Sequence, residues 1–344
     1  MPRQITRRRL ITAGAGIAVL GGLPGGIYVS FAMAADTKVR MTTGLRATTH
    51  SMSWLGTEAG IFKKHGLDVS FPNLELGAAE VAAGLMRGDW EFCHAGTLPF
   101  AENVLNGGDA VVLLRNTFPH KNQFVVSKRE HTTLGHLAGK RVGVLSDVYS
   151  GQSGVNTRLT LEKAGVTATY VRLGTYQNIY AALAAGEIDA GTQPVHLRFS
   201  GERQYGWNVF DTTGFEADVP SVFGTTRKLI ASNRDLVMRV VRGYVETIHA
   251  FKTQPDVFVP LLQRFLNISD QKVAEDLHKF YVPLFPQAPR LSMSEGMQAV
   301  RDIFSKTYPA AQRLQESDIS DSSFIGELEQ SGFIQRLYVG DPKR

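Results

Sequence analysis

The sequence predicts an α/β protein of two lobes, each a doubly wound, mostly parallel sheet flanked by helices, with extra helices at the C-terminal end. Three observations support this prediction: a motif that occurs twice, strands that alternate with helices around it, and 344 residues, enough for two cores. Alternating strands and helices are typical of parallel sheets covered on both faces. Two such lobes would form a cleft, which is the skeleton of a binding protein.

The repeated motif consists of Leu-Gly, an apolar-rich segment, and then Leu-x-x-Gly-x-x-acid. The copies begin at Gly77 and Gly174. Apolar residues recur three and four apart in them, which predicts a helix of about ten residues in each copy. Gly88 and Gly186 then fall where a helix ends in a left-handed turn. A buried strand is expected to follow, over residues 90–94 in the first copy and 188–192 in the second.

The acid that ends each motif is Glu91 or Asp189. A pair of carboxylates can perform general acid–base catalysis. The same position in both copies instead favours local hydrogen bonding at a strand end, so no catalytic residues are predicted here.

The similarity between the two copies extends upstream. Residues 39–43 and 141–145 are apolar-rich candidate strands, and each leads through a polar loop into a helix that ends at Gly66 or Gly165. Each unit is therefore predicted to be β-α-β-α-β.

The remaining chain joins and covers these units. Residues 124–127 are expected to cross to the second lobe, and the chain is expected to return around 219–230. From residue 233 the pattern is helical, and these helices are expected to pad the first lobe. The predicted first lobe is 35–125 with 226–344, the second is 126–225, and the two crossings would form a hinge.

The first 34 residues have the layout of an export signal. A basic start is followed by an uncharged stretch and by Ala32-Met33-Ala34, an A-x-A cleavage site. Residues 6–11, TRRRLI, resemble a twin-arginine signal. We expect export to the periplasm with cleavage near Ala34; a retained anchor is the alternative.

The net charge of +5 depends on this segment, because four arginines and no acids lie in it. The rest of the chain carries 33 basic and 32 acidic residues. This balance gives no reason to expect nucleic-acid binding. Cys93 is the only cysteine, so an internal disulfide is impossible, and we expect it to pack as a small apolar residue.

Four segments resemble a known family: AGIFKKHGLDV, LMRGDWEF, LAGKRVGV and LAAGEIDA. They are similar to the signature segments of the nitrate/sulfonate/taurine-type periplasmic substrate-binding proteins, a group that includes the thiamine-pyrimidine-precursor binders. The similarity extends from residue 39 to about 254. It implies a type II periplasmic binding fold that closes over a small solute, and delivery of that solute to the permease of an ABC importer in the inner membrane. We expect a monomer.

A ligand is expected at the carboxyl ends of the strands, where helix N-termini present free backbone N–H groups. The resemblance also places second-lobe donors at residues 150 and 151. The predicted ligand-binding residues are Arg46, His50, Ser51, Gly77, Ala78, His94, Ala95, Gly96, Thr97, Ser150, Gly151, Tyr176 and Gln193.

Most of these residues have a second interpretation. Arg46 can pair with a sulfonate or carboxylate, or be a solvated loop residue. Ser51 can cap a helix, Gly77 can serve only a tight turn, and Tyr176, like Trp54, can pack instead of stacking on a ligand. His50 and His94 both follow strands, but the short ligand spacing of a metal site is missing. No metal and no cofactor are predicted.

Three functions compete. The first is a solute receptor for ABC import, with a weak preference for a sulfonate or carboxylate over a neutral heterocycle. The second is an enzyme similar to the pyrimidine synthases of this fold family, which consume an active-site histidine and carry a cysteine cluster; residues 191–196, GTQPVH, contain no cysteine. The third is a periplasmic sensor of the same solute, which genes adjacent to this one would distinguish from a receptor.

Overall fold

The computed structural model describes residues 35–74, 76–118, 123–149, 151–210, 219–293 and 296–339. The expected export segment, residues 1–34, lies outside them. From Thr37 onward the chain forms one compact unit. Within the described residues, no helix is both long and apolar enough to cross a membrane.

The first sheet, sheet A, has the strand order β2-β1-β3-β10-β4. β1 is parallel to both β2 and β3, whereas β10 runs antiparallel to β3 and β4. One strand of five is therefore reversed, as expected for a mostly parallel sheet. The strands are β1 (Thr37–Thr43), β2 (Leu67–Asn73), β3 (Phe92–Gly96), β4 (Ala110–Arg115) and β10 (Ser221–Thr226).

The second sheet, sheet B, has the order β7-β6-β8-β5-β9 and repeats this plan. β6 is parallel to β7 and β8, and the reversed strand is β5, which pairs with β8 and β9. The strands are β5 (Gln123–Ser127), β6 (Arg141–Val144), β7 (Thr169–Arg172), β8 (Ala190–Pro194) and β9 (Asn208–Val209).

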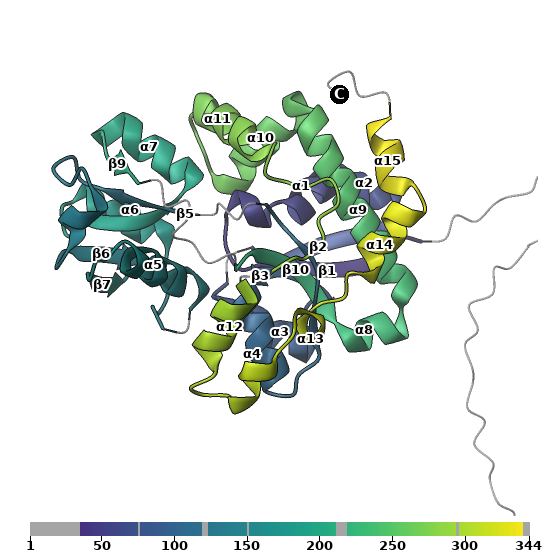
Figure 1. Ribbon diagram of the computed structural model, residues 1–344. Coiled ribbons are helices and arrows are strands. Elements are labelled where there is room, and N and C mark those ends of the chain that lie inside the picture. The colour runs from purple at the N-terminus through teal and green to yellow at the C-terminus, as the bar shows by residue number, and fades with distance from the viewer. Residues whose placement is uncertain are drawn as a thin grey trace, which may run out of the picture. The chain divides into compact units, whose positions relative to one another are not determined.

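Helices cover both faces of sheet A (Figure 1). On one side α9 packs against α1 and α2, and on the other α4 contacts α3, α12 and α13. The helices are α1 (Met52–Glu58), α2 (Ile61–Lys64), α3 (Ala78–Arg87), α4 (Thr97–Leu105), α5 (Gln152–Lys163), α6 (Tyr176–Ala184), α7 (Val195–Tyr205), α8 (Arg227–Ser232), α9 (Arg234–Thr253), α10 (Pro255–Leu266), α11 (Gln271–Tyr281), α12 (Gly296–Phe304), α13 (Glu316–Ile319), α14 (Ser323–Gln330) and α15 (Phe333–Tyr338), with 3-10 turns η1 (Thr48–His50), η2 (Leu134–Leu137) and η3 (Pro309–Arg313).

The repeated motif forms the predicted helix and glycine stop in both copies. α3 ends before Gly88, whose φ is 78°, and α6 ends just before Gly186, whose φ is 77°. Glycine is favoured at such a position because it has no Cβ to clash in the left-handed region.

The strand after each motif begins and ends two residues later than predicted. β3 covers residues 92–96 and β8 covers 190–194. The reversed neighbour of each strand explains the shift, because β10 pairs with β3 as far as Gly96 and β5 pairs with β8 as far as Pro194. Each strand leads directly into a helix, β3 into α4 and β8 into α7.

The C-terminal helix α11, which was expected to pad the first lobe, also contacts the second unit. This helix packs on α7 as well as on α10. The ring of Phe280 in α11 lies 6.0 Å from that of Phe124 in β5, centroid to centroid. The apolar face of α11 therefore serves sheet B too, and one buried cluster contains residues of both sheets, such as Phe92 and Phe124.

The segments predicted to cross between the lobes each contain a strand of one sheet. Residues 124–127 belong to β5 of sheet B, and the return segment 219–230 contains β10 of sheet A.

Candidate functional site

Two strands of sheet A and the start of α3 meet around Gly44, directly after β1. The Gly44 amide donates to the His94 carbonyl over 3.1 Å, and a Cβ at Gly44 would lie 3.6 Å from the Leu76 carbonyl oxygen. The structure thus brings together the ends of β1 and β3 and the start of α3, as parallel pairing predicts.

Glycine is the N-cap residue of three helices that begin near strand ends. These are Gly77 before α3, Gly96 before α4 and Gly151 before α5. Glycine has no side chain to cap the first-turn N–H groups. In α4 the Thr97 N–H instead donates to the Pro220 carbonyl over 3.2 Å, and in α5 the Gly154 N–H donates to the Ser146 hydroxyl over 2.9 Å. Gly77 is exposed, and a Cβ there would meet nothing within 4 Å. Space for a close approach to the backbone exists at this position.

His94 lies inside β3 and is completely buried. Its Nε2 is 2.9 Å from the Ser53 hydroxyl, and its ring stacks on His50 at 5.7 Å between centroids. Burial lowers the pKa of His94 well below its usual value, the nearby His50 adds to this, and the Asn116 side chain opposes it. His94 is therefore a neutral part of the core.

Other predicted residues of sheet A have bonds within the protein. The Arg46 guanidinium donates to the Phe265 carbonyl over 3.2 Å, and the Ser51 hydroxyl donates to the Thr48 carbonyl over 2.8 Å. The Thr97 hydroxyl donates to the Pro220 carbonyl over 2.7 Å. Ala95 is buried next to Gly96 in β3.

In sheet B, Gln123 joins three elements. Its Oε1 accepts from the Ser153 hydroxyl (2.5 Å) and from the Tyr176 hydroxyl (3.2 Å), and its Nε2 donates to the Ser153 carbonyl (3.1 Å). Burial raises the pKa of Tyr176 to about 12, with Ser153 opposing the rise. Tyr176 thus lies at the predicted edge as a neutral, hydrogen-bonded phenol.

Gln123 and Ser153 were missed by the sequence analysis. Gln123 is the polar first residue of β5 and precedes three apolar residues, and Ser153 follows the N-cap Gly151 by two residues. Their polarity at those positions was a usable signal, but the pairing of Gln123 with Pro194 depends on strand register.

Gln193 is completely buried in β8, and neither its Oε1 nor its Nε2 has a hydrogen-bond partner in the described part of the chain. His196, in the first turn of α7, is 4% exposed and its Nδ1 also has none there. Most buried polar groups in proteins are paired, so this strand end differs from the rest of the site.

Of the remaining predictions, Ser150 lies outside the described residues, as does the side chain of Ala78.

Glu91 and Asp189 form the predicted strand-end hydrogen bonds. Glu91 accepts from the Arg40 backbone amide over 2.6 Å, and Asp189 accepts from the Arg141 amide over 3.1 Å.

Among the described residues, no group of three or more histidine, cysteine or acidic side chains is arranged to hold a metal ion.

Three comparisons show what the chain is similar to. The alkanesulfonate-binding protein SsuA from Xanthomonas axonopodis pv. citri, solved bound to MOPS, aligns with a TM-score of 0.64 at 15% identity, over 84% of this chain and 99% of that one. A Candida albicans protein with the generic periplasmic binding protein fold aligns with a TM-score of 0.59 at 14% identity, over 85% and 95%. A Brucella abortus (strain 2308) protein, provisionally named a binding protein, is 26% identical over 230 residues, 63% of this chain and 68% of its own length.

The NMT1/THI5-like family model matches residues 47–257, more than half of the chain. The structural neighbours share the two-lobed α/β architecture of sheets A and B. The chain therefore belongs to the NMT1/THI5-like family and has the periplasmic binding protein fold.

Proposed function

We propose that this protein is an exported receptor that binds a small organic solute between the carboxyl edges of its two sheets. The observation that carries the proposal is the pair of matching edges. Glycine-capped helices begin at Gly77 and Gly96 near sheet A and at Gly151 near sheet B, and buried polar side chains adjoin them. The lobes would be built on sheet A and sheet B, with β5 (Gln123–Ser127) in the second lobe and β10 (Ser221–Thr226) in the first.

The solute class that we prefer is an organic sulfonate or carboxylate. Helix N-termini attract anions, and one structural neighbour is named an alkanesulfonate-binding protein. Arg46 adds a cation close to the same edge, although it already donates to Phe265. A micromolar affinity requires about 8 kcal/mol of binding free energy, which a few well-placed donors in a closed site can supply.

The partner would be the permease of an ABC importer, with the receptor acting as a monomer in the periplasm. The family membership supports this role, and the N-terminal export pattern supports the location. We propose a binding role rather than an enzymatic one. Cys93 is completely buried and burial raises the pKa of its thiol, while Glu91 and Asp189 are held by backbone amides.

A thermal-shift screen of the mature chain, beginning at Ala35, tests the proposal. The panel contains sulfonates, carboxylates, pyrimidines and flavin-like compounds. A bound solute at 100 times its Kd should stabilise the protein by about 2.7 kcal/mol. If no compound raises Tm, the receptor function is contradicted.

Gly77→Leu provides a site-specific variant. Its side chain would enter open space in the free protein and would crowd a solute at the backbone. We expect Tm without solute to stay the same and the solute-induced shift to be lost. Gly135→Leu is the matched control, because Gly135 is also exposed and lies in η2, away from the strand ends.

A further inference from the structure

The unpaired amide of Gln193 is costly for the free protein. A buried polar group without a hydrogen bond loses its contacts with water and gains nothing in return. Gln193 has two such groups, the Nε2 donor and the Oε1 acceptor, within one fully buried side chain. Gln123 shows the usual arrangement in the same sheet, because both its Oε1 and its Nε2 have partners. A residue that destabilises the fold in this way needs another reason to be present.

The position of Gln193 places its side chain where sheet B meets α11. Alternate residues of a strand share a face, and a Cβ at Gly191 would meet Ile179 of α6 at 2.5 Å. Gln193 therefore extends from the α6 face of β8. Its direct neighbour across the register is Phe124, whose ring contacts Phe280 of α11.

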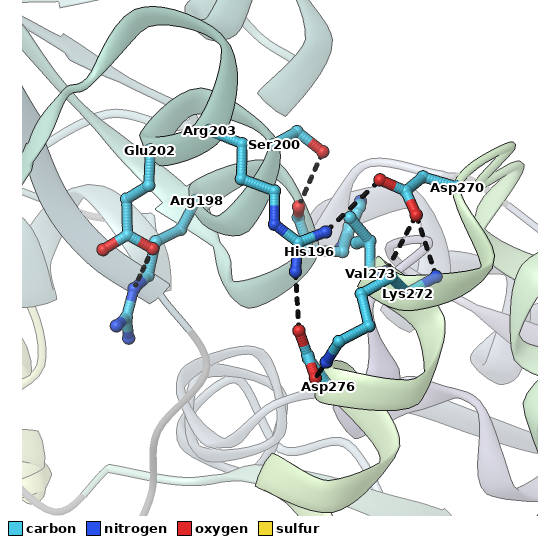
Figure 2. Close-up of polar contacts among 9 residues, drawn as sticks. All are labelled: His196, Arg198, Ser200, Glu202, Arg203, Asp270, Lys272, Val273 and Asp276. Atoms are coloured by element: carbon cyan, nitrogen blue, oxygen red, sulfur yellow. Dashed lines mark hydrogen bonds and ion pairs between the residues drawn. The ribbon is translucent and has the colours of Figure 1, made fainter.

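Two of the polar groups near this face, His196 and Tyr176, are neutral. Burial lowers the pKa of His196 to about 4, so its imidazole is uncharged at neutral pH. The Tyr176 hydroxyl is bonded to Gln123. A charged group is present on α7: Arg198 lies 4.5 Å from the Phe124 ring and pairs with Glu202 at 3.3 Å. His196 and Arg198 lie along the same helix in Figure 2.

We propose that Gln193 recognises a neutral part of the solute that carries a donor next to an acceptor, as in a carboxamide or lactam edge. A primary amide offers N–H and C=O side by side, and such an edge satisfies both. A sulfonate only accepts, so it would leave Oε1 unpaired. The unpartnered Nδ1 of His196 provides a second contact at the start of α7. This inference rests on the proposed receptor function, and an anionic group of the same solute would face sheet A.

Gln193→Met tests the inference, because methionine has a similar length and no strong hydrogen-bonding group. Without solute, we expect Tm of this variant to rise by about 2–4 °C, since the unpaired amide is removed. Gln123→Met is the matched control and should lower Tm, because that amide has partners on both atoms.

The binding half of the test uses 2-pyridone, uracil and benzamide against benzenesulfonate and isethionate. We expect an amide-edge solute to stabilise the natural protein, and Gln193→Met to bind it about tenfold or more weakly in calorimetry. The inference is overturned if Gln193→Met lowers Tm, if both proteins bind the amide-edge solute equally, or if only the sulfonates bind. In the last case the receptor function survives; if nothing in this panel or the wider screen binds, both proposals fail.

Discussion

The two repeated units share the hydrogen bonds between the motif's acid and the first strand, but their later strands end in different residues. In both, the motif's acid donates its backbone amide to the first strand over 2.9 Å, from Glu91 to Arg40 and from Asp189 to Arg141. Each carboxylate then accepts from the backbone amide of that same arginine.

The residues after each acid differ between the units, including those at the carboxyl ends of the strands. The first has Ala95, followed by Gly96 as the N-cap of α4, and the second has Gln193, followed by Pro194 as the N-cap of α7. The repeat therefore fixes the backbone framework, while the residues at the carboxyl ends of β3 and β8 differ between its copies.

The helices after these strands also make different contacts. Leu98 of α4 belongs to one buried apolar cluster with Val155 of α5. α7 instead uses charge: Arg203 pairs with Asp276 at 2.7 Å and with Asp270 at 3.3 Å, both near α11 (Figure 2). α4 therefore contacts the second unit by apolar packing. α7, the equivalent helix of the second unit, contacts α11 by ion pairs supported by aromatic contacts.

The largest expected difference in stability between the two units comes from substitutions at one pair of equivalent positions. Cys93 and Gly191 occupy the same position, two residues after the acid. A Cβ at Gly191 would lie 2.5 Å from Ile179 Cγ2, so Gly191→Cys should lower the free energy of unfolding by about 2–3 kcal/mol. Urea denaturation measures the change. Cys93→Ala, the control in the other unit, should cost only about 1 kcal/mol; equal costs would show that the two sheets pack alike.

Removing the charge of the strand-end acids should have a smaller effect, similar in both units. Glu91→Gln and Asp189→Asn each weaken a hydrogen bond to a backbone amide, and we expect a loss of about 1–2 kcal/mol in each case. Chemical denaturation of the two variants gives the comparison. A large loss in only one variant would mean that the shared bonds do not hold the two units equally.

The pH dependence supplies the check for Asp189. Burial would raise the pKa of Asp189, but the Arg141 amide, Lys128 and His131 together lower it. A carboxylate with a lowered pKa stabilises the fold above its unfolded pKa of about 4, and this contribution is lost as pH falls further. Asp189→Asn should therefore lose less stability on acidification than the natural protein.

The repeat explains which features the sequence could predict. Gly88 and Gly186 were identifiable because helix length and glycine spacing are local properties. The bonds of Glu91 and Asp189 followed from their matching positions in the two copies. The extension of β3 and β8 was missed because it depends on antiparallel neighbours more than 65 residues away in the chain.

Contacts between the units were also beyond the sequence. The amphipathic pattern of α11 predicts an apolar face, but not that Phe280 packs against Phe124. The partners of Gln123 and the absence of partners for Gln193 depend on the same tertiary arrangement. The sequence therefore predicted the edge at which Gln193 lies, but not the unsatisfied state of its amide.

Removing the ion pairs of Arg203 should produce the smallest change in stability, and its effect should be confined to the contact between α7 and α11. The Arg203 side chain is 41% exposed, and exposed ion pairs contribute little, so Arg203→Ala should shift Tm by less than about 2 °C. Amide hydrogen exchange in α11 should nevertheless become faster, because Arg203 holds α7 against it. High salt should have the same effect on α11 in the natural protein, and little effect where α4 meets α5.

Arg234→Ala is the matched control for Arg203→Ala. Arg234 pairs with Glu327 at similar exposure, but both residues belong to helices that pack on each other, α9 and α14. Its loss should leave exchange in α11 unchanged. If amide exchange in α11 of Arg203→Ala has the rate of the natural protein, then the aromatic contacts of Phe280 hold α7 and α11 together without the ion pairs. The contact of α7 with α11 would then depend on apolar packing, like that of α4 with α5.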